Sequence, residues 1–559
     1  ALKRGEKLVV VALKWLVIGR TRPGVYPLWG TYYFCIWLMQ RIVQLTAPKF
    51  LKGSPLIRVY MRALGAKVGK DAMIDEFEEG AIDLVRVGAR SSLGVKVKLA
   101  NVEVIGNQIH VGTIDIGEGV QIGNGTVIGH NVTIGDGAII GDLTALAAGT
   151  HVEAHTCWDG SPARQTGHAE HEVMPAHPEL GTVGRIFQFA AYFVAYNLSL
   201  VVGLLPIFPA FYLFTAVQQI YAPGTDEALS WGMIAALSWP AAFLLIVVSM
   251  AVVVALRWVL LPRVVPGRYS IFGNLYFRKW VVGLTTEAML ETLNSLYATV
   301  FMRNWYRLMG AKIGKGTEIS ANFAGRYDLI EMGRDNFIGD ETIFGDEEIQ
   351  NGWMVLKRLK TGDRCFFGNS SVISQGAVIE SDSLVGIKTR LPDSMHVKAG
   401  ETWCGSPAFQ LPTRERLQAA ASATYAPPLR MRLVRIVFEA MHTSLPTAIL
   451  IVMALFMSDM MAGEIDNGAW GSLFWTLMAA GLATSGILYL VAVAFKWTLI
   501  GTYKPMNRPM WSWWSMRTEA VAVFSGGLAS KMLLDYLRGT PFLPWLLRPF
   551  GAKIGQGTW

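Results

Sequence analysis

The chain has 559 residues, of which 52% are hydrophobic and 16% charged, whereas an average soluble protein has about 25% charged residues. This composition, with 19 Trp and 26 Phe, excludes a disordered chain. The four cysteines have no CxxC spacing, which excludes a disulfide-rich scaffold and a zinc ribbon. A net charge of +8 in so apolar a chain favours a membrane surface over nucleic acid as the partner. The 57 glycines indicate that part of the chain consists largely of turns.

Four stretches without Asp, Glu, Lys or Arg predict membrane-spanning helices. A spanning helix needs about 20 apolar residues, and each stretch is nearly that long or longer. They come in two pairs, so each pair predicts a transmembrane hairpin. In the first hairpin we expect Pro206 and Pro209 to kink the helix rather than end it. The stretches are residues 186–225, 228–256, 440–458 and 467–495.

The charges around the hairpins predict their orientation. The connections carry acidic residues without Lys or Arg, namely Asp226 and Glu227 in one and Asp459, Glu464 and Asp466 in the other. The opposite ends carry basic residues such as Arg257 and Lys496. By the positive-inside rule we expect a multi-pass membrane protein whose connections face outward, with everything outside the hairpins and their connections in the cytoplasm. Scattered, reduced cysteines agree with that compartment.

The chain contains an internal repeat. Gly-Ala-Lys-[Val/Ile]-Gly occurs three times, beginning at Gly65, Gly310 and Gly551. Trp-x-Gly-Ser-Pro-Ala occurs twice, beginning at Trp158 and Trp403, and both motifs recur at an offset of 245 residues. We call the first two repeats copy one and copy two.

A further repeated segment precedes each copy. It comprises residues 11–15, 254–258 and 493–497, and in the later two cases it ends a predicted membrane helix. Residues 1–22 are therefore predicted to form the end of another membrane helix. The alternative is a signal peptide, with Lys3 and Arg4 before an apolar run. We expect the chain to be part of a longer polypeptide, with a third copy beginning at Gly551.

Each copy contains a repeat of six residues. In copy one an aliphatic residue followed by Gly recurs every six residues, and a small or β-branched residue comes four positions after it; copy two follows the same frame more loosely. This hexapeptide pattern is typical of a left-handed parallel β-helix, where the aliphatic side chain points inward and the small one fits a corner. The aliphatic positions are Ile116, Ile122, Ile128, Ile134 and Ile140 in copy one, and Phe367, Ile373, Ile379 and Val385 in copy two.

The predicted fold class is an integral membrane α plus β protein, with tandem left-handed β-helices alternating with transmembrane hairpins. Aromatic segments precede the β-helices, and Tyr33, Trp37, Tyr276 and Trp280 alternate there with Arg and Lys. Such segments are interfacial helices on the inner leaflet or, alternatively, plain helices packed on the β-helix. The predicted segments are 1–22 (helix end), 23–64 (aromatic), 65–167 (β-helix), 168–184 (linker), 185–262 (hairpin), 263–309 (aromatic), 310–412 (β-helix), 413–428 (linker), 429–500 (hairpin), 501–550 (interfacial) and 551–559 (start of a third β-helix).

This layout resembles the C-terminal region of ε-poly-L-lysine synthetase-type proteins, which are NRPS-like amino-acid homopolymer synthetases. The likeness rests on the Trp-x-Gly-Ser-Pro-Ala ends, the Gly-Ala-Lys starts, and residues 27–30 with their counterparts 270–273. It implies adenylation and carrier domains upstream of Ala1 in the same polypeptide. It further implies that the copies transfer an aminoacyl group from a thioester on the carrier's 4′-phosphopantetheine to an amine acceptor, at a lipid membrane.

The β-helices also resemble hexapeptide acyltransferases, which are commonly trimers with active sites between β-helices. That resemblance implies a pseudo-trimer of copies within the full chain. By the same resemblance we expect Gly160, Ser161, Gly405 and Ser406 to contact the pantetheine arm.

Aminolysis of a thioester needs a base, which is usually His in hexapeptide acyltransferases. Copy one has His110, His130, His151 and His155; the 245-residue offset places Val355, Gln375, His396 and Gly400 opposite them. Only His151 and His396 are shared, so that pair is the first candidate for the base, and the alternative is that it closes the last coil. His130 stands at a turn position resembling those that acyltransferases use, and His110 is a further candidate. Asp83 and Asp328 are also shared, either to orient a base or to cap a turn.

Two other clusters have simpler explanations. Asp75, Glu76, Glu78 and Glu79 are suited to recognise a cationic monomer, but copy two lacks them and a solvated face is the favoured interpretation. His151, His155, Cys157, His168 and His171 match no standard zinc spacing, so we expect no metal. Two functions stay open besides the condensing enzyme. One is a membrane acyltransferase that uses acyl-CoA on a lipid or polysaccharide precursor, and the other is a non-catalytic scaffold.

Overall fold

The computed structural model describes residues 2–45, 48–75, 77–78, 80–169, 175–221, 223, 229–292, 296–323, 325–412, 420–466 and 470–558. The chain forms two compact units. The first comprises Ala1–Val201, Val254–Ala288 and Met302–Glu415, and the second comprises Val202–Val253, Met289–Phe301 and Arg416–Trp559. Both β-helices belong to the first unit. The predicted linkers 168–184 and 413–428 lie partly outside the described residues, which omit 170–174 and 413–419.

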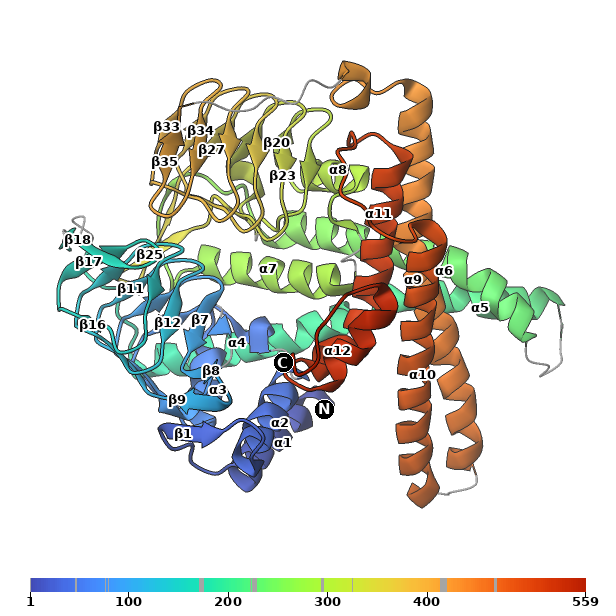
Figure 1. Ribbon diagram of the computed structural model, residues 1–559, viewed down its shortest axis with the longest axis horizontal. Coiled ribbons are helices and arrows are strands. Elements are labelled where there is room, and N and C mark those ends of the chain that lie inside the picture. The colour runs from blue at the N-terminus through green and yellow to red at the C-terminus, as the bar shows by residue number, and fades with distance from the viewer. Residues whose placement is uncertain are drawn as a thin grey trace. The chain divides into compact units, whose positions relative to one another are not determined.

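Copy one is a parallel β-helix with three faces (Figure 1). The first face stacks β2 (Lys67–Val68), β5 (Val85–Val87), β10 (Ile114–Ile116), β13 (Val132–Ile134) and β16 (His151–Val152). The second stacks β3 (Met73–Ile74), β6 (Ser92–Leu93), β11 (Gln121–Ile122), β14 (Ile139–Ile140) and β17 (Thr156–Asp159), with β18 (Arg164–His168) antiparallel at the end. The third stacks β4 (Phe77–Glu78), β7 (Val97–Ala100), β12 (Val127–Gly129) and β15 (Ala145–Leu146).

Copy two has the same three faces. The first face stacks β20 (Lys312–Ile313), β22 (Ile330–Met332), β27 (Leu359–Thr361), β30 (Val378–Ile379) and β33 (His396–Val397). The second stacks β21 (Glu318–Ile319), β23 (Phe337–Ile338), β28 (Phe366–Phe367), β31 (Leu384–Val385), β34 (Thr402–Cys404) and β35 (Phe409–Leu411). The third stacks β24 (Ile343–Phe344), β29 (Val372–Ile373) and β32 (Arg390–Leu391).

The hexapeptide prediction is confirmed in both copies. Every aliphatic ladder residue named above is at most 3% exposed. Burial of one such side chain contributes about 1.5–3 kcal/mol, so the ladder is the main source of β-helix stability. The glycines let successive coils approach closely, because a Cβ on Gly123 would lie 2.5 Å from the backbone nitrogen of Asp142 in the next coil.

A β-hairpin interrupts one coil of each copy and was not predicted. In copy one it consists of β8 (Val102–Ile105) and β9 (Gln108–Val111), and β1 (Gly24–Pro27) adds a third antiparallel strand. In copy two the equivalent strands are β25 (Glu348–Gln350), β26 (Trp353–Leu356) and β19 (Gly267–Ser270). Residues 102–111 carry a signal for it, since alternating apolar and polar residues flank a Gly-Asn turn.

Helices cover the start of each β-helix. In copy one these are α1 (Leu2–Val17), α2 (Thr31–Leu45) and α3 (Pro55–Ala63), and in copy two α7 (Asn274–Thr292) and α8 (Val300–Leu308). On α7, Tyr276 and Trp280 are buried, and they donate hydrogen bonds to the carbonyl oxygens of Gly53 (2.8 Å) and Lys52 (2.7 Å) in copy one. For these two side chains the structure favours the packed helix over the interfacial one.

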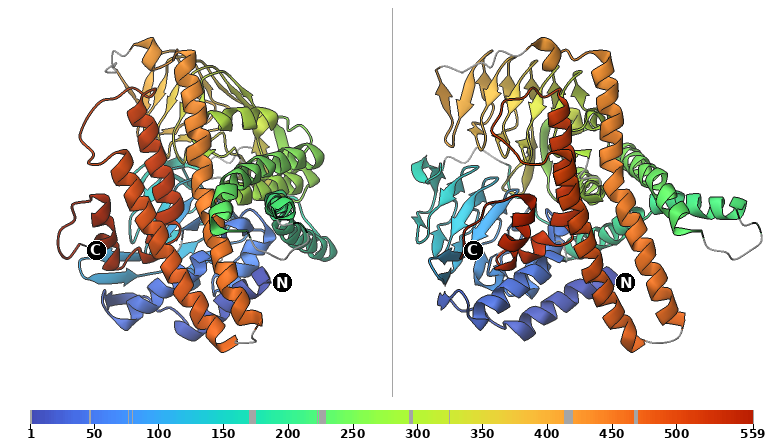
Figure 2. Two further views of the ribbon diagram at one scale, coloured as in Figure 1. Left: turned by 90° about the vertical axis from the view of Figure 1, so that its right-hand side faces the viewer. Right: turned by 45° about the vertical axis from the view of Figure 1, so that its right-hand side comes forward.

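Within the described ranges, four helical segments are long and apolar enough to cross a membrane, namely Thr182–Tyr221, Trp231–Leu260, Leu429–Ala462 and Gly471–Leu499. The first comprises α4 (Thr182–Val202) and α5 (Ile207–Tyr221), the second is α6 (Trp231–Leu260), and the last two belong to α9 (Leu429–Asp466) and α10 (Trp470–Leu499). Figure 2 shows α9 and α10 as an antiparallel hairpin. The kink expected at Pro206 is instead a break, because proline lacks the N–H that would continue the helix. Asp226 and Glu227 lie outside the described residues.

The third repeat begins like the other two. It contains α11 (Trp513–Phe524), a π-helical turn at Ser525–Ser530, and α12 (Phe542–Leu547) before Gly551. The indole N–H of Trp497 donates to the carbonyl oxygen of Pro549 at 2.7 Å. Trp15 and Trp258 make the same contact with Ala63 and Leu308, at 2.9 and 2.8 Å.

Candidate active site

The inserted hairpin of copy one brings two of the predicted histidines together. His110 on β9 and His130, in the turn after β12, have ring centroids 5.9 Å apart. Glu103 on β8 faces His110 across the hairpin, and its Oε2 lies 3.3 Å from Nδ1 of His130. The side chain of His130 is 14% exposed, whereas that of Glu103 is 51% exposed. This contact is electrostatic rather than a hydrogen bond, because Nδ1 of His130 is buried and has no hydrogen-bond partner among the described residues.

The same corner of copy two has no histidine. Gln375 replaces His130, Val355 replaces His110, and Glu348 is equivalent to Glu103. Oε1 of Gln375 accepts a hydrogen bond of 2.9 Å from the backbone N–H of Lys357. Nε2 of Gln375 is buried and has no hydrogen-bond partner among the residues that the structure describes.

Gln375 lines a cleft between the two β-helices, with a volume of about 160 Å³. One wall is the second face of copy one, with Ile122, Ile140 and the turns that follow them. The opposite wall belongs to copy two. The charged side chains in the lining are Asp75, Asp142, Asp346, Glu347, Glu348, Asp393 and Arg390.

Contacts between the copies lie beside this cleft, because Asp142 and Arg390 are among its lining residues. Arg390 of copy two forms ion pairs with Asp142 and Asp159 of copy one. The backbone N–H of Ser161 donates to the carbonyl oxygen of Ser406 at 3.1 Å. A Cβ on Gly160 would lie 2.9 Å from Pro407. The Gly-Ser-Pro-Ala ends that we expected to contact a pantetheine arm are thus in contact with each other.

Burial gives the carboxyl groups of the cleft unusual pKa values. It raises the pKa of Asp75 to about 7 and that of Asp142 to about 6, although Lys52 and Arg390 oppose these increases. The ion pairs of Glu347 with Lys279 and Arg326 outweigh its burial and lower its pKa. We expected Asp75 on a solvated face, but it lines the cleft; Glu76 and Glu79 lie outside the described residues.

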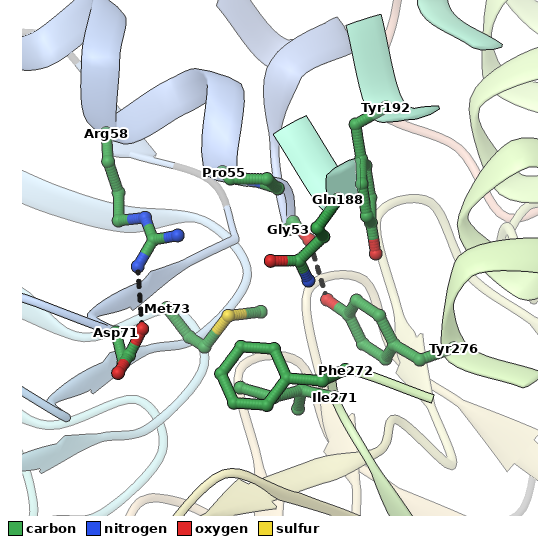
Figure 3. A pocket seen from close by; sticks show the side chains of 10 residues that line it. All are labelled: Gly53, Pro55, Arg58, Asp71, Met73, Gln188, Tyr192, Ile271, Phe272 and Tyr276. Atoms are coloured by element: carbon green, nitrogen blue, oxygen red, sulfur yellow. Dashed lines mark hydrogen bonds and ion pairs between the residues drawn. The ribbon is translucent and has the colours of Figure 1, made fainter. Parts of the chain in front are cut away.

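A second cavity of about 10 Å³ shares Gly53 and Met73 with the cleft (Figure 3). Phe272 and Tyr276 of copy two line it together with Arg58 and Asp71 of copy one. A cavity of this size holds at most about one water molecule, so it is part of the packing between the copies.

The first candidates for the base, His151 and His396, occupy equivalent exposed positions on β16 and β33. Nε2 of His396 lies 2.8 Å from Oε1 of Glu380. Copy one has Gly135 in place of Glu380, so only copy two has this pair. Neither histidine lines the cleft.

The two shared aspartates connect each β-helix to the helix before it. Asp83 accepts hydrogen bonds from Nζ of Lys14 (2.9 Å) and the backbone N–H of Thr21 (2.7 Å). Asp328 accepts them from Nη2 of Arg257 (2.5 Å) and the backbone N–H of Val264 (2.9 Å). These contacts assign both carboxylates to anchoring and satisfy them without a substrate. Among the described residues, no group of three or more His, Cys, Asp or Glu is placed to hold a metal; His171 lies outside them.

Comparisons with known proteins agree with this architecture. The family model "Bacterial transferase hexapeptide (six repeats)" matches residues 113–148. Over 550 residues the chain is 32% identical to the delta-poly-L-ornithine synthetase of Acinetobacter baumannii, covering 98% of this chain and 41% of that protein. The resemblance to amino-acid homopolymer synthetases is confirmed. The chain spans about two fifths of this relative's length, and these matches relate it to transferases and synthetases, which are enzymes.

Two solved structures show more distant similarity. A hexapeptide-repeat acetyltransferase of Vibrio cholerae, solved with acetyl coenzyme A, is 17% identical and matches 24% of this chain and 88% of its own, with a TM-score of 0.20. The serine acetyltransferase of Neisseria gonorrhoeae is 19% identical and matches 30% of this chain and 67% of its own, with a TM-score of 0.16.

Proposed function

We propose that this chain is the condensing region of a membrane-bound amino-acid homopolymer synthetase. In this role it transfers an aminoacyl group from a carrier-bound thioester to an amine and forms a peptide bond. The poly-ornithine synthetase that matches nearly the whole chain supports this activity, as does the hexapeptide transferase model. The observation that carries the proposal is the shielded His130 with Glu103 at its Nδ1.

His130 is the proposed general base. The amine nitrogen attacks the thioester carbonyl carbon, the C–N bond forms and the C–S bond breaks. Nε2 of His130 takes the proton that the amine loses and returns it to the departing sulfur, so atoms and charge balance. Glu103 is the positioning residue, because its negative charge beside the ring stabilises the imidazolium. We prefer His130 to His151 and His396, whose exposed rings give a reacting thioester no shelter from water.

The repeat indicates where the acceptor binds. Gln375, the counterpart of His130, lines the cleft between copies one and two. By the same geometry His130 would line an equivalent cleft formed with a third β-helix. This is the pseudo-trimer that we propose for the full chain. The thioester would reach it on the 4′-phosphopantetheine of the upstream carrier domain, which supplies the activated acyl group.

The non-catalytic alternative holds for one part of copy two, the corner that is equivalent to the His110 and His130 corner of copy one. Val355 and Gln375 have no group that accepts a proton at neutral pH, so we propose that the corner of copy two binds without catalysing. No observation favours acyl-CoA as the donor over a carrier.

Location at the bacterial inner membrane is also a proposal. The four apolar segments are compatible with membrane spans, and the basic residues at their β-helix ends favour cytoplasmic β-helices. Addition of a membrane-impermeant thiol reagent to intact cells tests this. Cys157 and Cys404 should react only after the cells are opened.

Polymer formation by the full-length protein tests the function. His130→Gln reproduces the residue of copy two and should leave aminoacyl loading intact while polymer yield falls about 100-fold or more. His151→Gln is the matched control, because this exposed histidine has no part in the proposed mechanism, and it should support normal synthesis. Normal polymer from His130→Gln would contradict the proposal.

A further inference from the structure

The cleft between copies one and two contains a hydrogen-bond donor without an acceptor. Gln375 is 4% exposed, and its Oε1 is held by the backbone N–H of Lys357. This contact fixes the amide among the residues that line the cleft, and no described residue accepts the hydrogens of Nε2. A buried amide N–H group needs a hydrogen-bond acceptor, so a ligand with a carbonyl oxygen would complement Nε2 of Gln375.

The charged side chains of the lining are carboxylates except for Arg390. Four cations next to the cleft are already paired: Lys279 with Glu347, Arg326 with Asp346 and Glu347, Arg390 with Asp142 and Asp159, and Lys52 with Glu287. Asp75 and Asp393 have no ion-pair partner among the described residues. A cationic ligand would therefore find two acidic side chains outside the ion pairs of the lining, and its charge would favour the ionised form of Asp75.

The two requirements describe one kind of molecule. A peptide of basic amino acids has an amide carbonyl and an ammonium group in every residue. We propose that this cleft holds the growing cationic homopolymer, with ammonium groups at Asp75 and Asp393 and an amide carbonyl oxygen at Nε2 of Gln375. The proposal rests on the proposed function and names its substrate class.

The cleft would retain the polymer without reacting on it. The amide of Gln375 cannot act as a base, so binding here and proton transfer at His130 are separate tasks on equivalent corners of successive copies. Retention keeps the chain end close to the enzyme between additions and raises its effective concentration.

Binding of a fluorescein-labelled L-ornithine decamer to the detergent-solubilised full-length protein tests this by fluorescence anisotropy. Asp75→Asn with Asp393→Asn should weaken binding about tenfold or more, and Gln375→Leu should weaken it about threefold or more. Glu153→Gln, an exposed carboxylate of copy one outside the cleft, is the matched control and should leave binding unchanged. A decamer with acetylated side-chain amines should bind about tenfold more weakly than the cationic one.

Equal binding by the wild type and both cleft variants would overturn the proposal, as would equal binding of the acetylated decamer. Displacement of the decamer by free pantetheine, with no effect of the Asp substitutions, would assign the cleft to the carrier arm instead. Melting temperatures show whether each variant folds, and Gln375→Leu carries the test if the double Asp variant does not.

The result can be separated from the proposed function. His130→Gln should bind the decamer like the wild type while making no polymer. If His130→Gln still makes polymer, the assignment of the base fails and the binding result stands by itself.

Discussion

The backbone N–H of Ser161 donates a 3.1 Å hydrogen bond to the carbonyl oxygen of Ser406, and these residues occupy the same place in successive repeats. Beside them Arg390 pairs with Asp142 and Asp159 across the two copies. Equivalent motifs can contact each other only near the axis that relates their copies. This contact agrees with the pseudo-trimer that we propose, in which clefts form between neighbouring β-helices.

Glu103→Gln should slow condensation without weakening substrate binding. The amide keeps the size of the side chain but loses the charge that stabilises the protonated ring of His130. We expect kcat to fall about 10- to 100-fold with little change in KM, measured as polymer formation by the full-length protein. Glu348→Gln in copy two is the matched control. An unchanged kcat would remove Glu103 from the mechanism.

The double substitution His151→Ala with His396→Ala should leave polymer formation and chain length unchanged. Both rings are exposed, and only His396 has a nearby carboxylate, on Glu380. Polymer length on a denaturing gel measures the outcome. Loss of synthesis with normal aminoacyl loading would return the role of the base to this pair.

Asp328→Asn should destabilise the first unit by about 3 kcal/mol, because it leaves the buried guanidinium of Arg257 without its charge partner. The control is Asp382→Asn, which breaks an exposed pair with Arg364 and should cost about 1 kcal/mol or less. The free energy of unfolding of the purified protein in detergent compares them. Equal effects of the two substitutions would contradict the anchoring role.

Asp75 should make stability depend on pH. Burial raises its pKa from 3.8 to about 7, with Asp346 and Glu347 adding to the increase and Lys52 and Lys279 opposing it. The folded protein therefore keeps a proton that the unfolded chain has lost, and the free energy of unfolding decreases as the pH rises between about 4 and 7.

Asp75→Asn should remove this dependence and raise the melting temperature at about pH 8. Glu153→Gln should keep the pH dependence of the wild type. Thermal unfolding at about pH 5 and about pH 8 measures both, and a wild type that is more stable at the higher pH would contradict the account.

The coils of the β-helix were predictable because inward-facing apolar side chains recur every six residues along the sequence. Ile116 to Ile140 are buried as the six-residue spacing requires, and the charge-free stretches mark the long apolar helices. Short-range patterns of this kind determine local structure directly.

The site was less predictable because it depends on contacts between distant segments. Glu103 approaches His130 only through the inserted hairpin, and Gln375 meets copy one only when the copies pack together. Asp83 and Asp328 occupy equivalent positions in the two copies, as a shared catalytic residue would, but their contacts anchor helices. An equal offset between repeats therefore identifies equivalent positions and does not reveal their role.

Single-turnover transfer from a preloaded carrier tests the central claim most directly. The full-length protein is loaded with radiolabelled amino acid, freed of ATP, and mixed with a soluble amine acceptor. For His130→Gln we predict normal loading and a transfer rate reduced about 100-fold or more, while the control His151→Gln transfers at the wild-type rate. Transfer by His130→Gln at the wild-type rate would contradict the account.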